Sequence, residues 1–186
     1  MRKLPNDAVL LVVDVQQAFN DGTWGERNNP DAERYVFELL ERWRTDGRPV
    51  IHIHHCNPAA GSRFNPGSPG VLAQPGAQPL EGEPVLSKRV NSAFIGTDLE
   101  ARLRDMGATT LVIVGLTTDH CVSTTTRMAG NLDFTVILVS DATATHERRG
   151  PDGRHYSASV MHDTALASLD GEFATVATTA EVMQAL

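Results

Sequence analysis

The sequence is poor in the features that mark secreted or membrane-bound proteins. Its 186 residues contain only two cysteines, Cys56 and Cys121, which fits a reducing cytoplasm better than a disulfide scaffold. No apolar run approaches the ~20 residues that a membrane span needs. The apolar run near the N-terminus is short, is interrupted by Asp14 and has no convincing cleavage site after it, so we expect no signal peptide. We therefore expect a cytoplasmic protein.

Positive charge is also scarce. Lys and Arg number 16 against 23 Asp and Glu, which gives a formal net charge of -7. This balance argues against a nucleic-acid or anionic-membrane partner. An apolar content of 41% with 21% charged residues is typical of a globular chain, and the length allows a substantial core. No repeat or linker is visible, so we expect a single domain over residues 1–186.

Six short apolar runs lie along the chain, at 8–13, 49–55, 83–88, 111–115, 134–140 and 172–177. Their β-branched, nearly continuous character predicts strands that are buried on both faces, as in a parallel sheet. Helical patterns are expected between most of them, at about 30–47, 97–107, 119–130 and 156–169. This alternation predicts an α/β fold with helices on both faces of the sheet.

Local signals predict where two of these helices begin. Asn29 offers an N-cap with Pro30 at the first helical position. Thr97 and Glu100 have the spacing of a capping box. We therefore expect both helices to start with a side-chain cap.

Two polar stretches do not fit the alternation. Residues 56–82 contain five prolines and five glycines, and residues 142–155 form a second polar segment. Loops longer than ~12–15 residues are uncommon in compact domains and are often functional. Either stretch could shape the mouth of an active site or act as a lid; a plain surface connection is the alternative.

Three residues of complementary chemistry follow three of the predicted strands. Asp14 ends the first strand, Lys88 ends the third, and Cys121 comes a few residues after the fourth. The carboxyl ends of parallel strands meet at one edge of a sheet, where ligands bind. If these strands are neighbours, a carboxylate, an ammonium and a thiol converge on one cleft. The spacing alone does not prove adjacency, and each residue taken singly could be structural or solvated.

The position of Cys121 favours a nucleophile. It lies at the start of a predicted helix, where the positive end of the macrodipole favours the thiolate. Its neighbour Asp119 reads as the helix N-cap or a first-turn acid with a structural role. Cys56 is followed by Pro58 and a flexible stretch, and we interpret it as a bystander. This pattern points to a cysteine hydrolase.

The chain resembles the isochorismatase-like cysteine hydrolase family, the cysteine amidohydrolases related to nicotinamidase and N-carbamoylsarcosine amidohydrolase. The matching segments are VVDVQQAF, PGSPG, SKRVNSAFIGTDLE, GLTTDHCVSTTTRMA and VSDAT. The resemblance implies a three-layer α-β-α sandwich with a six-stranded, mainly parallel sheet, and a homodimer or homotetramer. It also implies a catalytic triad of Asp14, Lys88 and Cys121, an oxyanion hole made by the backbone amides of Thr117 and Cys121, and a cis peptide between Leu116 and Thr117.

The resemblance further implies a reaction. Isochorismatases proper cleave a vinyl ether and lack the cysteine, so Cys121 points to hydrolysis of a C–N bond in a small amide, carbamoyl or ureido compound through a thioester. Lys88 would lower the pKa of the thiol and hold Asp14, which would act as general base and then as general acid. Two alternatives stay open: a metal-assisted nicotinamidase-type amidase, and a non-catalytic or redox-responsive binding protein.

Histidines 52, 54 and 55 invite a metal interpretation. Strand alternation places His52 and His54 on one face and His55 on the other, so the three do not converge. Nicotinamidases resemble this chain but carry an Asp-x-His and a further His near this position, and that pattern is missing here. We therefore expect no metal and no other cofactor.

Five residues are candidates for binding a small-molecule substrate. Phe19 resembles the aromatic pocket wall of related amidases, and His55 at a strand end suits the pocket lining. The remaining candidates are Trp24, Asn91 and Phe94. Core packing is the competing account for the aromatic residues. Arg148 and Arg149 could meet a substrate carboxylate, but a solvated charge pair is the preferred reading, and His162 is read as structural.

Overall fold

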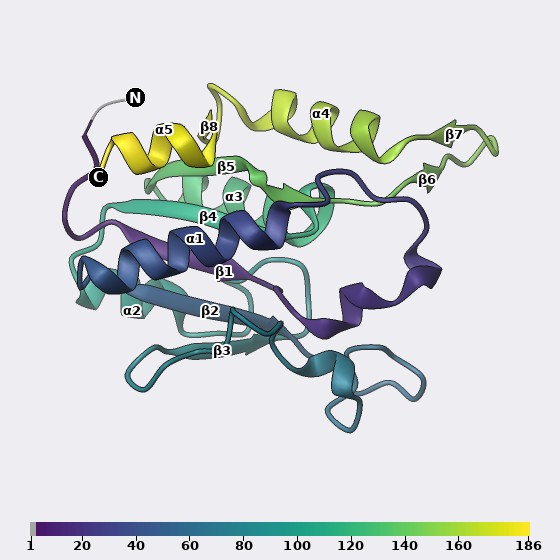
Figure 1. The fold of residues 1–186 in the computed structure, drawn as a ribbon, viewed down its shortest axis with the longest axis horizontal. Helices are drawn as coiled ribbons and strands as arrows, with labels where there is room; N and C mark the ends of the chain where they lie inside the picture. Colours follow the sequence, from purple (N-terminus) through teal and green to yellow (C-terminus); the bar gives the residue numbers. More distant parts are fainter. Residues whose placement is uncertain (1–2) are drawn as a thin grey trace.

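A computed structural model describes residues 3–186 and shows one six-stranded, all-parallel sheet flanked by helices (Figure 1). Each predicted strand is present, in the order β3-β2-β1-β4-β5-β8. The bounds are β1 Val9–Val13, β2 Val50–His55, β3 Val85–Lys88, β4 Thr110–Leu116, β5 Thr135–Ala144 and β8 Thr175–Ala177. The chain order reverses between β1 and β4, and this is the point at which such sheets bind ligands.

The core forms two clusters, one on each face of the sheet. Alternate residues of β1 divide between them: Val9, Leu11 and Val13 enter one cluster, Leu10 and Val12 the other. Helices α1 (Ala32–Thr45) and α5 (Thr179–Gln184) contribute to the second cluster. Helices α2 (Leu99–Asp105), α3 (Ser123–Asn131) and α4 (Ala158–Leu169) contribute to the first. This arrangement confirms the three-layer sandwich.

Both predicted helix caps are wrong. Helix α1 begins after Asp31, and Asn29 instead has a φ of 44° and donates from Nδ2 to the carbonyl of Thr143 at 2.7 Å. Helix α2 begins after Asp98, and the hydroxyl of Thr97 donates to the carbonyl of Ala93. The Asn29 side chain thus satisfies distant carbonyls rather than the orphan amides of a helix start. Thr97 is not the N-cap residue, although its Oγ1 also accepts a long hydrogen bond of 3.4 Å from the amide of Leu99, the first residue of α2.

The third expected helix has an irregular beginning. Residues Thr118–Val122 form a single π-helical turn that leads directly into α3. Such π-turns are rare and occur frequently at functional sites. Cys121 lies within this turn, so its backbone position differs from that of a residue in a regular α-helix.

Several elements were not expected from sequence. The polar stretch at 142–155 contains the end of β5 and a small antiparallel hairpin of β6 (Arg148–Arg149) and β7 (His155–Tyr156), which projects from the body in Figure 1. Helix α5 has a full capping box at Thr178 and Glu181. Short 3-10 turns lie at Gln17–Asn20, Gly22–Trp24 and Pro69–Val71. No helix of the described part is long and apolar enough to cross a bilayer.

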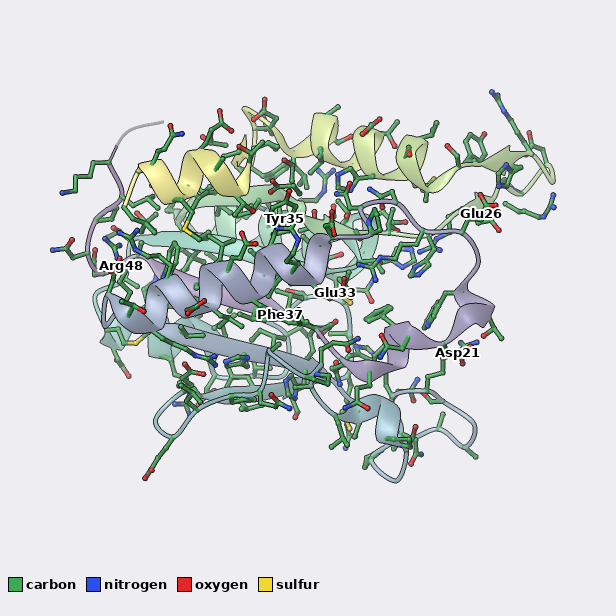
Figure 2. All side chains as sticks on the ribbon, in the orientation of Figure 1. Asp21, Glu26, Glu33, Tyr35, Phe37 and Arg48 are labelled. Atoms are coloured by element: carbon green, nitrogen blue, oxygen red, sulfur yellow. The ribbon has the colours of Figure 1, made fainter. Side chains whose placement is uncertain are left out.

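An ion pair joins two of the irregular segments. Figure 2 labels Asp21 on the chain between β1 and α1, and its Oδ2 accepts a hydrogen bond from Arg63 Nε at 2.7 Å. Arg63 belongs to the proline-rich loop at 56–82, and its guanidinium also lies 4.5 Å from the ring centre of Trp24. The loop is thereby fixed beside the carboxyl end of β1.

Candidate active site

A cavity of about 130 Å³ opens at the carboxyl edge of the sheet, near the reversal between β1 and β4. Strands, connecting loops and the hairpin all contribute to it. The lining residues are Asp14, Phe19, Trp24, His55, Phe64, Asn91, Thr117, His120, Cys121 and Arg148. Asp14 and Cys121 belong to this lining, and Lys88, which does not, contacts both of them, so the three residues expected at the strand ends do meet.

Asp14 enters the site through a local turn at the end of β1. Its φ is 51°, an unusual value for a residue with a side chain, and its amide donates to the carbonyl of Ile53 at 2.8 Å. The carboxylate is buried and accepts a hydrogen bond at Oδ2 from Lys88 Nζ at 2.6 Å. Burying the two opposite charges together offsets the desolvation cost of each one.

The ammonium of Lys88 has two further partners. Its Nζ lies 3.2 Å from Cys121 Sγ and 3.3 Å from His55 Nδ1. Burial and the neighbouring Lys88 charge lower the pKa of His55, so the imidazole is neutral and Nδ1 accepts the hydrogen bond. Lys88 therefore joins a carboxylate, a thiol and an imidazole at one buried point.

Protonation in this site is governed by burial. Burial raises the pKa of Asp14, while the charge and hydrogen bond of Lys88 oppose the rise. Burial, followed by the charge of Asp14, raises the pKa of Cys121 to about 12, against the opposing effect of Lys88. The unliganded site therefore holds a thiol, whereas the helix-start position and Lys88 had suggested a thiolate. Desolvation outweighs both effects.

Asp14 retains one free oxygen for a proton transfer. Its Oδ1 is buried and has no hydrogen-bond partner among the described residues. Ligand atoms of Asp14, His55 and Cys121 all lie within 4.8 Å of one another. An acceptor without a partner is thus close to the thiol that would release the proton.

The turn that contains Cys121 is held by backbone hydrogen bonds. The carbonyl of Thr117 accepts hydrogen bonds from the amides of His120 and Val122 at 3.1 and 3.2 Å. The peptide between Leu116 and Thr117 is cis, as the family resemblance predicted. Among the described residues, the amide of Thr117 has no acceptor, and the Thr117 residue lines the cavity.

Sequence and structure comparisons assign this chain to a known family. The isochorismatase domain model matches residues 8–181. The chain belongs to the isochorismatase family. It is 47% identical over 174 residues to the uncharacterized family protein YrdC of Bacillus subtilis, covering 94% of this chain and 93% of that protein. A crystal structure of a family hydrolase from Chromobacterium violaceum matches with a TM-score of 0.97 and 43% identity, covering 100% of this chain and 96% of that one.

Two other relatives carry names of hydrolases. Streptothricin hydrolase of Streptomyces noursei is 36% identical over 141 residues, covering 74% of this chain and 50% of that protein. Ureidoacrylate amidohydrolase RutB of Methylobacterium radiotolerans is 27% identical over 217 residues, covering 98% of this chain and 80% of that protein. The relatives of this chain therefore include hydrolases, one of which is named as an amidohydrolase.

Four of the five residues expected to bind substrate line the cavity of this family member. The rings of Phe19 and Trp24 lie 5.4 Å apart, and His55 and Asn91 complete this part of the lining. Cys121 Sγ lies 3.8 Å from Asn91 Oδ1. Phe94 is placed elsewhere, because its ring stacks on Phe134 at 6.2 Å and packs against the core of the α2/α3 face.

Two of the lining residues, Phe64 and His120, were not among the binding candidates expected from the sequence, and Arg148 was considered but not preferred. The ring of Phe64 lies 5.4 Å from Phe19 and 5.0 Å from His55. Phe64 was the one aromatic residue in the proline-rich stretch at 56–82, and that isolation was the available signal. Arg148 had been read as solvated, but the hairpin places it at the cavity.

The three potential metal ligands in the cavity already surround a cation. Asp14, His55 and Cys121 could in principle hold an ion, but Lys88 Nζ lies within 3.3 Å of an atom of each. A second cation there would be repelled by the ammonium, so the residues present do not fit a metal. His52 is engaged elsewhere, with its Nε2 2.8 Å from Glu83 Oε2.

Proposed function

We propose that this protein is a cysteine amidohydrolase that cleaves a C–N bond of a small amide, carbamoyl or ureido compound through a thioester. The observation that carries the proposal is the placement of Lys88 Nζ at 2.6 Å from Asp14 and 3.2 Å from Cys121, with Asp14 Oδ1 left free. The cavity size suits a small molecule. The name of the relative RutB, a ureidoacrylate amidohydrolase, supports an amide or ureido substrate, and that of streptothricin hydrolase supports hydrolysis.

In the first half-reaction, Asp14 Oδ1 takes the thiol proton as Cys121 Sγ attacks the substrate carbonyl carbon. The raised pKa of Asp14 makes it a stronger base than an ordinary carboxylate. Amides of Thr117 and Cys121 donate to the oxyanion that forms; loss of one such donor costs ~2.7–4 kcal/mol in other enzymes. The C–N bond then breaks, and the leaving nitrogen takes the proton from Asp14.

In the second half-reaction, water attacks the thioester carbonyl. Asp14 accepts a proton from this water, the C–S bond breaks, and the proton returns to the sulfur. Lys88 contacts both side chains and stabilises the negative charge that passes between Asp14 and Cys121. The aromatic wall of Phe19, Trp24 and Phe64 holds the rest of the substrate.

The test is ammonia release from a panel of small amides, carbamoyl compounds and ureides. Wild-type protein should release ammonia from at least one compound, and Cys121→Ala should abolish this activity while its circular dichroism stays unchanged. Cys56→Ala is the matched control and should remain active, because Cys56 does not line the cavity. Turnover that survives in Cys121→Ala would reject the nucleophile and with it this mechanism.

A further inference from the structure

Arg148 has unused hydrogen-bonding capacity at the cavity. Its side chain is 25% exposed, and its Nη1 donates to the carbonyl of Glu147 at 3.2 Å. Its Nε lies 3.5 Å from Asp119 Oδ2, and this oxygen is buried without a hydrogen-bond partner. No described residue accepts a hydrogen bond from Nη2. The guanidinium therefore has one carbonyl contact and one long ion pair.

Other arginines in this protein show what a completed pair looks like. Arg44 binds Glu83 through two hydrogen bonds, at 2.7 and 2.8 Å. Arg27 binds Glu33 in the same two-pronged way, and Figure 2 labels Glu33 on α1. Such fork-to-fork pairing is the preferred geometry between arginine and a carboxylate. Arg148 lacks it, although Asp119 is near.

Arg148 lies where its unpaired hydrogen-bond donors can contact a molecule in the cavity. Among the described residues that line the cavity, Asp14 is the one acidic residue, and Lys88 already balances its charge. Arg148 is the one Lys or Arg residue in this lining. Asp119 does not belong to the lining. Thr145 donates a hydrogen bond to the Asp119 carboxylate and holds it beside Arg148. Arg148 is thus the cationic group that a molecule in the cavity would meet.

We propose that Arg148 determines substrate specificity by binding a carboxylate on the substrate, apart from the C–N bond that is cleaved. This inference rests on the proposed function. A guanidinium presents planar paired donors that match a carboxylate, whereas the small cavity leaves little room for a larger anionic group. The substrate class is therefore a short amide or ureido acid, with its carbonyl at Cys121 and its carboxylate at Arg148.

Binding can be measured without turnover in a Cys121→Ala background. The probes are malonamate, succinamate and glutaramate, each paired with its neutral diamide, and calorimetry gives Kd for both members of a pair. At least one monoamide should bind about 10- to 100-fold more tightly than its diamide, as expected for a charge-assisted hydrogen bond. Arg148→Met should abolish this ratio, and Arg148→Lys should retain part of it.

Arg149→Met provides the matched control, because Arg149 is exposed and lies outside the cavity lining. It should keep the full preference for the monoamide. Equal Kd values within every pair, no measurable binding of any monoamide, or a preference that survives Arg148→Met would overturn the role of Arg148. Ammonia release by wild-type protein is scored separately: its absence together with preferred monoamide binding would reject the hydrolase and leave the carboxylate site.

Discussion

The buried pair of Lys88 and Asp14 allows a quantitative prediction for Lys88→Met. Methionine keeps much of the side-chain volume but removes the ammonium. Asp14 Oδ2 then loses its hydrogen bond, and Oδ1 already has no partner among the described residues. Removing one member of a buried ion pair costs about 3–5 kcal/mol in free energy of unfolding. For a chain of 186 residues, this loss corresponds to a fall in Tm of about 6–20 °C.

The destabilisation should depend on pH, because Asp14 can take up a proton. Burial raises the pKa of Asp14, and Lys88 opposes the rise, so the variant raises it further. A carboxyl group whose pKa is higher in the folded state stabilises the fold below its unfolded pKa of about 3.9. This stabilisation is lost as pH increases through the folded pKa. The deficit of Lys88→Met should therefore be largest at high pH and shrink as the pH falls.

Urea unfolding at acidic and alkaline pH, followed by tryptophan fluorescence, measures this deficit; Trp43 is fully buried and reports on the core. The matched control is the double variant Asp14→Asn/Lys88→Met, which removes both charges and should recover part of the lost stability. A deficit of equal size at both pH values would refute the reasoning, as would a double variant less stable than Lys88→Met alone.

Two further predictions concern the state and the placement of the thiol. Because burial and Asp14 raise the pKa of Cys121 to about 12, iodoacetamide should modify unliganded Cys121 slowly at neutral pH and steadily faster as the pH increases. Peptide mass spectrometry with Cys56 as internal reference measures this, and a rate plateau near neutral pH would contradict it. Thr118→Val removes the hydroxyl that lies 2.9 Å from His162 Nδ1, so kcat should fall about 10-fold with KM little changed. Thr118→Ser should retain kcat, and equal kcat values in both variants would show that the hydroxyl does not position the turn.

Much of the fold could be predicted because the strands have a recognisable sequence pattern of short apolar runs. All six apolar runs became strands, since a strand buried on both faces must be apolar at nearly every position. The helix starts were less predictable. Asn29 has the chemistry of an N-cap, but carbonyls far along the chain, at Ser140 and Thr143, take its side-chain donors instead. Local chemistry could not reveal this competition.

The candidate site also contains some residues that the sequence could single out and others that it could not. Asp14, Lys88 and Cys121 could be singled out because each follows a recognisable strand, and the resemblance to a family strengthened their selection. Phe64 could not, because it lies in an irregular segment whose path depends on tertiary contacts. Arg148 could be named as a possible carboxylate contact, but only the folded hairpin shows that it lies at the cavity. Phe94 was a plausible pocket residue by type, but its half-buried ring stacks on Phe134 and packs against the core instead.

The sequence by itself determined the strands, the two apolar faces and the chemical groups available at the strand ends, because these depend on residue type and local spacing. Tertiary structure alone decided that Lys88 meets Asp14, His55 and Cys121 at one point. It also decided that the Cys121 thiol has a raised pKa and that Arg148 lines the cavity. Desolvation and charge pairing depend on what surrounds a group in space, and residues far apart in the chain supply those surroundings only after folding.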